Sequence, residues 1–146
     1  MQVNHISPFL LTLLLLPVMK SSASSRMIWV TSGGAVITEF PQSNDAHPVQ
    51  ALCPLQFKPE EAHNMYFTSK LLNIMCCAEL ARRTPVRIAA SHPGLVDIEL
   101  GKKDMHEENL QPVDLEATWG MKQRSPAEGA KTVLIPATYD TSVVWD

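Results

Sequence analysis

The chain has 146 residues, of which 45% are hydrophobic and 18% charged, and its net charge is −3. This length can bury a core in one domain, and this composition excludes an intrinsically disordered chain. The mild negative charge gives no reason to expect nucleic acid or an anionic membrane as a partner. The three cysteines, Cys53, Cys76 and Cys77, favour a reducing compartment over a disulfide framework, so we expect a cytoplasmic protein. No spacing of the histidines predicts a metal site.

The first predicted element is a helix within the uncharged apolar run PFLLTLLLLPVM. It covers Leu10–Met19 and is apolar nearly all round, which is typical of a helix packed on both sides. The run is shorter than the roughly 20 apolar residues that span a bilayer. Its length also suits a secretion leader, and SSASS supplies small residues after it, but MQVNHISP before it has no Lys or Arg. We favour the interior helix and keep the leader of a small secreted protein as an alternative.

A strand over Met27–Val30 follows, apolar without alternation, as in a parallel sheet that is covered on both faces. It leads into the Gly-rich turn TSGG. Residues 35–63 then carry four prolines among scattered polar residues, which predicts a long loop or lid, and loops of this length tend to be functional or disordered.

The second half of the chain continues with a helix over Met65–Arg83, which Pro85 ends. Glu79 and Arg83 are spaced for an ion pair on this helix. Val86–Ala90 reads as a second strand, and residues 101–123 show no clear element. The sequence SPAE at residues 125–128 is a capping box that begins a helix running to about residue 136. This order of helices and strands predicts an α/β fold with a parallel sheet.

The pair Tyr66 and Lys70 is the sharpest candidate for chemistry, because residues four apart share one face of a helix. A nearby ammonium lowers the tyrosine pKa from about 10, so the pair can exchange a proton with an alcohol or carbonyl oxygen. Ser32 and the Pro93-Gly94 pair each follow a strand, at the edge where open α/β sheets bind ligands. A half-exposed tyrosine and two ordinary turns would explain the same residues without function.

Five segments resemble, in order, those of the short-chain dehydrogenase/reductase family, and especially its retinol-dehydrogenase-like and WW-domain-containing-oxidoreductase-like branches. They are VNHISPFLLTLLLLP, RMIWVTSGG, YFTSKLLNIMCCAELARR, VRIAASHPGLVDIEL and SPAEGAKTVL. The resemblance runs from residue 2 to about residue 138, with a variable loop between Ser32 and Tyr66, and it implies that residues 35–63 form the substrate-side loop. It implies one partial domain over residues 1–146, with an incomplete Rossmann-like parallel sheet and flanking helices.

The resemblance also implies roles for individual residues. Tyr66 would be the catalytic acid/base, and Lys70 would lower its pKa and bind the nicotinamide ribose. Ser32 would hydrogen-bond the substrate oxygen, and Asn4 would hold a water that relays protons through Lys70. The cofactor side would comprise Asn4, Tyr66, Lys70, Pro93, Gly94 and Val96. The implied reaction is hydride transfer between NADP(H), or NAD(H), and a small alcohol or carbonyl compound, with secondary metabolism as a plausible setting. A homo-oligomer through the Asn4 and Tyr66 helices is also implied.

The sequence departs from the pattern of the family at several points. It contains no G-x-x-x-G-x-G motif to cradle the pyrophosphate, and Ile98 stands where a threonine usually follows the Pro-Gly turn. Without the strands that precede it in the family, the strand at Met27 is expected to expose an edge that invites pairing. Three hypotheses follow: an oxidoreductase, a catalytically inactive chain that binds a partner through this edge or the Tyr66 helix, and a small secreted protein. NADPH binding separates the first two, and an N-terminus near Ser22 would establish the third.

Overall fold

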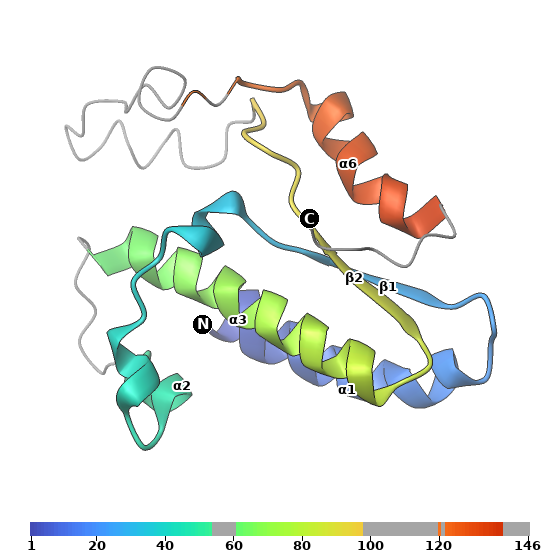
Figure 1. Cartoon of the computed structure of the whole chain (residues 1–146), viewed down its shortest axis with the longest axis horizontal. Helices are drawn as coiled ribbons and strands as arrows, with labels where there is room; N and C mark the ends of the chain where they lie inside the picture. Colours follow the sequence, from blue (N-terminus) through green and yellow to red (C-terminus); the bar gives the residue numbers. More distant parts are fainter. Residues whose placement is uncertain (54–60, 98–119, 121, 139–146) are drawn as a thin grey trace.

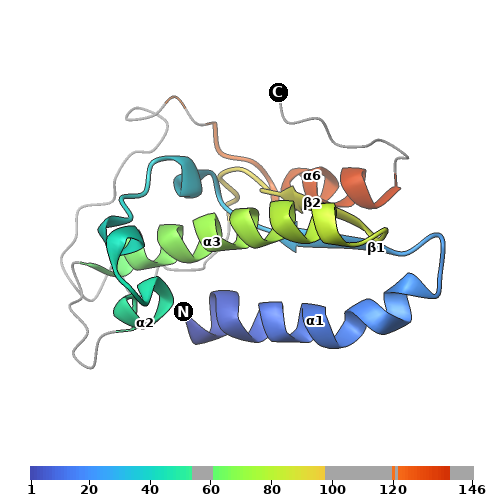
Figure 2. The ribbon, with the colours of Figure 1, turned by 60° about the horizontal axis from the view of Figure 1, so that its bottom comes forward.

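A computed structural model describes residues 1–53, 61–97, 120 and 122–138. Its centre is a two-stranded parallel sheet of β1 (Arg26–Val30) and β2 (Arg87–Ser91) (Figure 1). Helices α1 (Ser7–Lys20) and α3 (Ala62–Arg83) lie on one face of the sheet, and α6 (Pro126–Thr138) lies on the other (Figure 2). This arrangement confirms the predicted α/β fold with a parallel sheet and flanking helices.

The N-terminal helix begins earlier than predicted. A π-helical turn, η1 (Gln2–Ile6), runs directly into α1. The expectation that this helix packs on both sides is wrong, because Thr12 is its one fully buried residue and Leu10, Leu14 and Val18 are exposed. One side of α1 packs on the sheet and α3, and no described element covers the outer side.

Residues Gln2–Lys20 together form one helix that is long and apolar enough to cross a membrane. The apolar run counted in the sequence is shorter, since it omits the turn of η1. A core helix of a soluble protein and a signal sequence pass the same length and composition test. The length and composition of this helix therefore agree both with an interior helix and with a secretion leader.

The core lies between the sheet and α3. Trp29 packs against Cys77 and Leu80, and the partly buried Phe9 and Leu16 of α1 also pack against this cluster. Burial of this apolar surface is the main force that holds the layers together. β1 is nevertheless less buried than its apolar sequence predicts, because Trp29 is its one fully buried residue.

Helix α3 begins three residues earlier than predicted and ends as expected. The predicted ion pair between Glu79 and Arg83 is present. Thr84 follows the helix in an extended conformation with φ −139° and ψ 146°, as the residue before a proline prefers.

The described part of residues 35–63 contains short helical turns rather than an irregular loop. They are η2 (Gly33–Val36), η3 (Pro41–Asn44) and α2 (Pro48–Ala51), and the last two begin at a proline. Asn64 ties this segment to α3. Its Oδ1 accepts from Thr38 Oγ1 at 2.8 Å, and its Nδ2 donates to the Glu39 carbonyl at 2.9 Å.

The predicted capping box of α6 is confirmed. Glu128 Oε2 accepts from the Ser125 N–H at 2.8 Å, and the Glu128 N–H donates to Ser125 Oγ at 3.3 Å. The helix continues to Thr138, two residues beyond its predicted end. Ile98 and most of residues 101–123 lie outside the described residues.

Candidate active site at the carboxyl edge of the sheet

The turns that follow the two strands lie side by side. The His92 ring packs against Gly33, so that its Cε1 would stand 3.6 Å from a Cβ atom added there. The segment after β1 carries Ser32, and the segment after β2 carries Pro93 and Gly94. The structure therefore brings these predicted site residues to one edge of the sheet.

Ser32 is the N-cap of η2, and its Oγ accepts from the Gly34 N–H at 3.3 Å. This contact uses the hydroxyl as an acceptor, so its own O–H is left to donate to another group. Phe67 of α3 packs directly on Gly34, where an added Cβ would stand 2.1 Å from the ring. A glycine is required at this point, because it lets the Ser32 turn approach α3 closely.

Tyr66 and Lys70 share one face of α3 near this edge. Lys70 Nζ lies 5.6 Å from the centroid of the Tyr66 ring and donates to the Val30 carbonyl at 3.1 Å. Burial lowers the pKa of the Lys70 ammonium. The Tyr66 side chain is 41% exposed, and its hydroxyl makes no hydrogen bond with any described residue. The Tyr66 phenol is thus accessible to a ligand, while the Lys70 ammonium beside it is held in place by the Val30 carbonyl.

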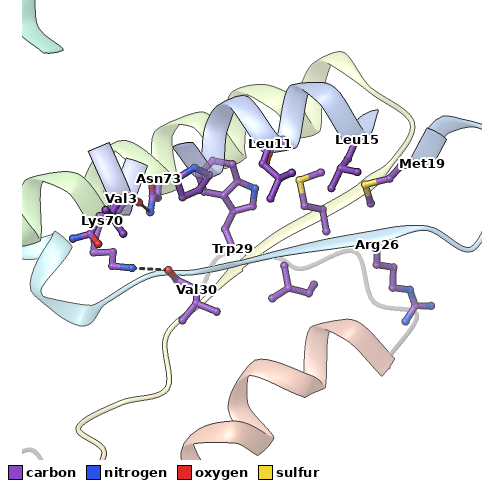
Figure 3. A pocket seen from close by; sticks show the side chains of 14 residues that line it. Val3, Leu11, Leu15, Met19, Arg26, Trp29, Val30, Lys70 and Asn73 are labelled. Atoms are coloured by element: carbon purple, nitrogen blue, oxygen red, sulfur yellow. Dashed lines mark hydrogen bonds between the residues drawn. The ribbon is translucent and has the colours of Figure 1, made fainter. Parts of the chain in front are cut away.

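The main-chain carbonyl of Asn4 is bound to α3 close to Lys70. Its carbonyl accepts from Asn73 Nδ2 at 2.9 Å, and Asn73 Oδ1 makes a buried hydrogen bond of 2.7 Å with His5 Nδ1. Asn4, Lys70 and Asn73 line one cavity of about 510 Å³ (Figure 3). Ser32 and Tyr66 do not line this cavity. Asn4 and Lys70 are thus brought together on one side of the candidate site.

The turn after β2 is fastened to the segment before α6. Gly94 has φ +79°, a conformation that favours glycine, and Val96 forms a parallel bridge with Arg124. Arg124 Nη1 also donates to the Pro93 carbonyl at 3.4 Å. Pro93, Gly94 and Val96 therefore have a defined backbone position beside the carboxyl edge.

Sequence reasoning missed three residues that shape this site: His5, Asn73 and Arg124. Asn73 carried a signal, because it follows Lys70 by three positions and so lies on the same face of the predicted helix. His5 and Arg124 carried none, since their contacts join segments far apart in the chain.

The described cysteines and acidic residues form no second candidate site. The three cysteines are free thiols, and burial together with Cys76 raises the pKa of Cys77 to about 11. In the described ranges, no group of three or more His, Cys, Asp or Glu side chains could hold a metal ion.

Comparisons with known proteins give related sequences but no structural match. The chain is 36% identical over 137 residues to dehydrogenase/reductase SDR family member 13 of Bos taurus, an alignment that covers 92% of this chain and 34% of that protein. It is 34% identical over 142 residues to human retinol dehydrogenase 14, covering 93% of this chain and 38% of that protein. Human retinol dehydrogenase 13 is 32% identical over 143 residues, covering 94% and 39%.

No family model and no solved structure matches the chain. The chain spans roughly a third to two fifths of the length of these relatives, with 34%, 38% and 39% of each covered. The same alignments cover more than nine tenths of this chain, so they include both strands and the helix that carries Tyr66. Their Rossmann-like α/β fold agrees with the parallel sheet described above. The chain belongs to the short-chain dehydrogenase/reductase family.

Proposed function

We propose that this chain forms the substrate side of an oxidoreductase site that interconverts an alcohol and a carbonyl group of a small molecule with NADP(H) or NAD(H). The observation that carries the proposal is the fixed Lys70 ammonium over the ring of the exposed Tyr66. The names of the relatives, retinol dehydrogenases and a dehydrogenase/reductase, support it. A role in secondary metabolism stays a prediction.

Tyr66 would move the proton. Its hydroxyl would donate to a carbonyl oxygen during reduction and accept from an alcohol during oxidation. The Lys70 cation stabilises the charged phenolate that forms when this proton leaves. Ser32, whose O–H is free to donate, would hold the substrate oxygen in line with the phenol.

Asn4 and Lys70 would return the proton to solvent. Both line the cavity of about 510 Å³, which is polar at this point because Asn73 also lines it. A water between the Asn4 segment and the Lys70 ammonium would have partners on both sides, as a buried water needs. The Asn73 contact holds the Asn4 carbonyl in place for this role.

In this proposal the described residues would hold the nicotinamide end of a cofactor. When bound, the cofactor supplies or accepts the hydride. Lys70 and Tyr66 would hold the ribose, and the Pro93–Gly94 turn with Val96 would line the nicotinamide, since Arg124 fixes that turn beside the carboxyl edge. The sequence has no Gly-rich turn for the pyrophosphate, so the fit extends to this end alone.

We further propose that two copies associate through α1 and α3, and that the protein is cytoplasmic. The outer side of α1 supports the first idea, because Leu10, Leu14 and Val18 form one exposed stripe at spacings of four residues. Sedimentation of the wild type and of the double variant Leu10→Glu/Leu14→Glu tests it. A dimer that the double variant converts to a monomer would support the idea, and an unaffected oligomer would refute it.

Calorimetric titration of the whole chain with NADPH tests the oxidoreductase proposal, together with the shift in melting temperature. We expect saturable binding that Lys70→Met weakens and that Lys131→Met, an exposed lysine on α6, leaves unchanged. A folded chain that binds neither NADPH nor NADH would favour the binding-only alternative.

A further inference from the structure

The two turns of the candidate active site leave the sheet side by side, and the imidazole of His92 contacts both of them. The last hydrogen bond of the strand ladder runs from the Thr31 N–H to the Ser91 carbonyl at 2.9 Å. Beyond it, no backbone hydrogen bond of the described residues connects the Ser32 turn with the Pro93–Gly94 turn. The separation of the two turns is therefore left to side-chain contacts.

On one side, the His92 ring holds the backbone of Gly94. Its Nδ1 accepts a hydrogen bond from the Gly94 N–H at 3.2 Å. A nitrogen that accepts carries no proton, so the ring is neutral and its proton is on Nε2. Arg124 covers the other side of this glycine, since a Cβ atom added to Gly94 would stand 3.1 Å from Arg124 Nε. The imidazole and the guanidinium thus hold Gly94 between them.

On the other side, the same ring lies against Gly33. A Cβ atom added there would stand at ordinary contact distances, 3.6 Å from His92 Cε1 and 3.8 Å from His92 Nδ1. Gly33 lies between Ser32 and Gly34, whose N–H donates to Ser32 Oγ at 3.3 Å. The imidazole therefore supports the backbone of the turn that orients the Ser32 hydroxyl.

The separation of these turns matters if the proposed function holds, and the inference rests on that function. Ser32 would hold the substrate oxygen, and the Pro93–Gly94 turn would line the nicotinamide. The atoms between which a hydride moves must lie about 3–3.5 Å apart, and a misplacement of about 1 Å can cost about 10²-fold in rate. A change in the distance between the two turns would therefore change the distance over which the hydride moves.

We infer that His92 is a positioning residue, whose neutral imidazole acts as a spacer between the Ser32 turn and the Pro93–Gly94 turn. Its Nδ1 fixes the cofactor side of the site, and the face of its ring supports the substrate side. A side-chain bond to the N–H two residues on is also an ordinary way to close a turn. Such a local role would explain the Gly94 contact but not the packing against Gly33, which belongs to a distant segment of the chain.

Two variants separate the two contacts, and each is the control for the other. His92→Asn keeps an acceptor, because an asparagine oxygen can bond the N–H two residues on, but it removes the ring. His92→Phe keeps an aromatic ring against Gly33 but has no acceptor for the Gly94 N–H. A spacer predicts opposite effects of these variants on the two turns.

Hydrogen exchange of two amides in the whole chain, followed by NMR without nucleotide, tests the spacer directly. The Gly94 N–H reports on the cofactor side, and the Gly34 N–H reports on the Ser32 turn. We expect His92→Phe to speed exchange at Gly94 and to leave Gly34 near its wild-type rate. His92→Asn should do the reverse. Equal effects of both variants on both amides, or no effect of either, would overturn the inference.

Nucleotide binding and turnover test the positioning role. His92→Phe should weaken NADPH binding by about twofold to tenfold, as the loss of one ordinary hydrogen bond does. In an active preparation, His92→Asn should keep the KM for NADPH and lower kcat by at least about tenfold, because the substrate oxygen is then misplaced. Lower melting temperatures of both variants, without this split between KM and kcat, would reduce His92 to a structural residue.

The two kinds of measurement also separate this inference from the function on which it rests. A wild-type chain that binds neither NADPH nor NADH would refute the oxidoreductase proposal, whatever the amides show. Wild-type binding of NADPH together with equal behaviour of the two variants would refute the spacer alone.

Discussion

The side chains of His5 and Asn73, 68 positions apart in the sequence, share a buried hydrogen bond of 2.7 Å. Asn73 Nδ2 is already committed to the Asn4 carbonyl, so its Oδ1 must be the acceptor and His5 Nδ1 must carry the proton. This contact joins η1 to α3 and holds the Asn4 segment beside Lys70.

Removing either partner of this bond should destabilise the fold. His5→Ala and Asn73→Ala each leave a buried polar group unpaired, at a cost of about 1–3 kcal/mol in the free energy of unfolding. Urea denaturation measures the loss, and the double variant should cost less than the sum of the two. Gln2→Ala, which breaks an exposed bond to Ser7, is the control and should change little. Additive losses would contradict direct coupling.

A methyl group at Gly34 should disturb the contact between the Ser32 turn and α3. Gly34→Ala puts a Cβ 2.1 Å from the Phe67 ring, so we expect a loss of about 1–3 kcal/mol in the free energy of unfolding. Gly33→Ala is the matched control, because its Cβ would stand at an ordinary 3.6 Å from His92. Phe67→Leu should restore part of the loss. Equal stability of the two alanine variants would refute this packing.

Loss of the Tyr66 hydroxyl should abolish most activity without affecting the fold. In an active preparation, Tyr66→Phe removes the proton donor and should lower kcat by about 10²–10⁴-fold. The hydroxyl makes no hydrogen bond with a described residue, so the melting temperature should be unchanged. Steady-state kinetics with NADPH and a carbonyl substrate measure the effect. Wild-type turnover in this variant would remove Tyr66 from the proposed mechanism.

The capping box of α6 should make stability depend on pH. Hydrogen bonds from Ser125 lower the pKa of Glu128 below its ordinary value of 4.5. A carboxyl whose pKa is depressed by folding stabilises the protein above its unfolded pKa, and this contribution is lost as the pH falls through the folded pKa. Urea denaturation of the wild type and Glu128→Gln at several pH values checks the sign. The free energies of unfolding of the two proteins should differ near neutral pH and converge in acid. A difference that grows in acid would contradict the stabilising role of the Glu128 carboxylate.

The thiols should differ in their reaction with iodoacetamide. Cys77 is buried and its pKa is raised to about 11, so it holds almost no thiolate near pH 8. Cys53 is exposed and should be alkylated first. Mass spectrometry of peptides from native and urea-unfolded samples measures both. Rapid alkylation of Cys77 in the native protein would show that the cluster around Trp29 opens readily.

Local patterns predicted the parts of the fold that depend on neighbouring residues. The four-residue spacing placed Tyr66 and Lys70 on one face, and the SPAE sequence placed the start of α6 at a capping box. These features follow from helical geometry and from the hydrogen-bonding needs of helix ends, which are local.

Tertiary packing decided the parts that the sequence left unpredicted or predicted wrongly. The apolar character of α1 indicated burial on all sides, yet burial depends on which elements stand beside the helix, and composition does not specify them. The His5–Asn73 bond and the Val96–Arg124 bridge join residues that no local pattern relates.

Lys70 lies between the cavity of about 510 Å³ beside α1 and the candidate active site. It contacts Val30 on one side and the Tyr66 ring on the other, and an ammonium has three N–H groups to distribute. An anionic group that pairs with this ammonium from the cavity would weaken its stabilisation of the Tyr66 phenolate. By reciprocity, a ligand at Tyr66 that pairs with the same cation must weaken the binding of an anionic group in the cavity by an equal free energy. Because both ligands use the Lys70 side chain, each lowers the affinity for the other, and the concentration of one ligand controls the occupancy of the other.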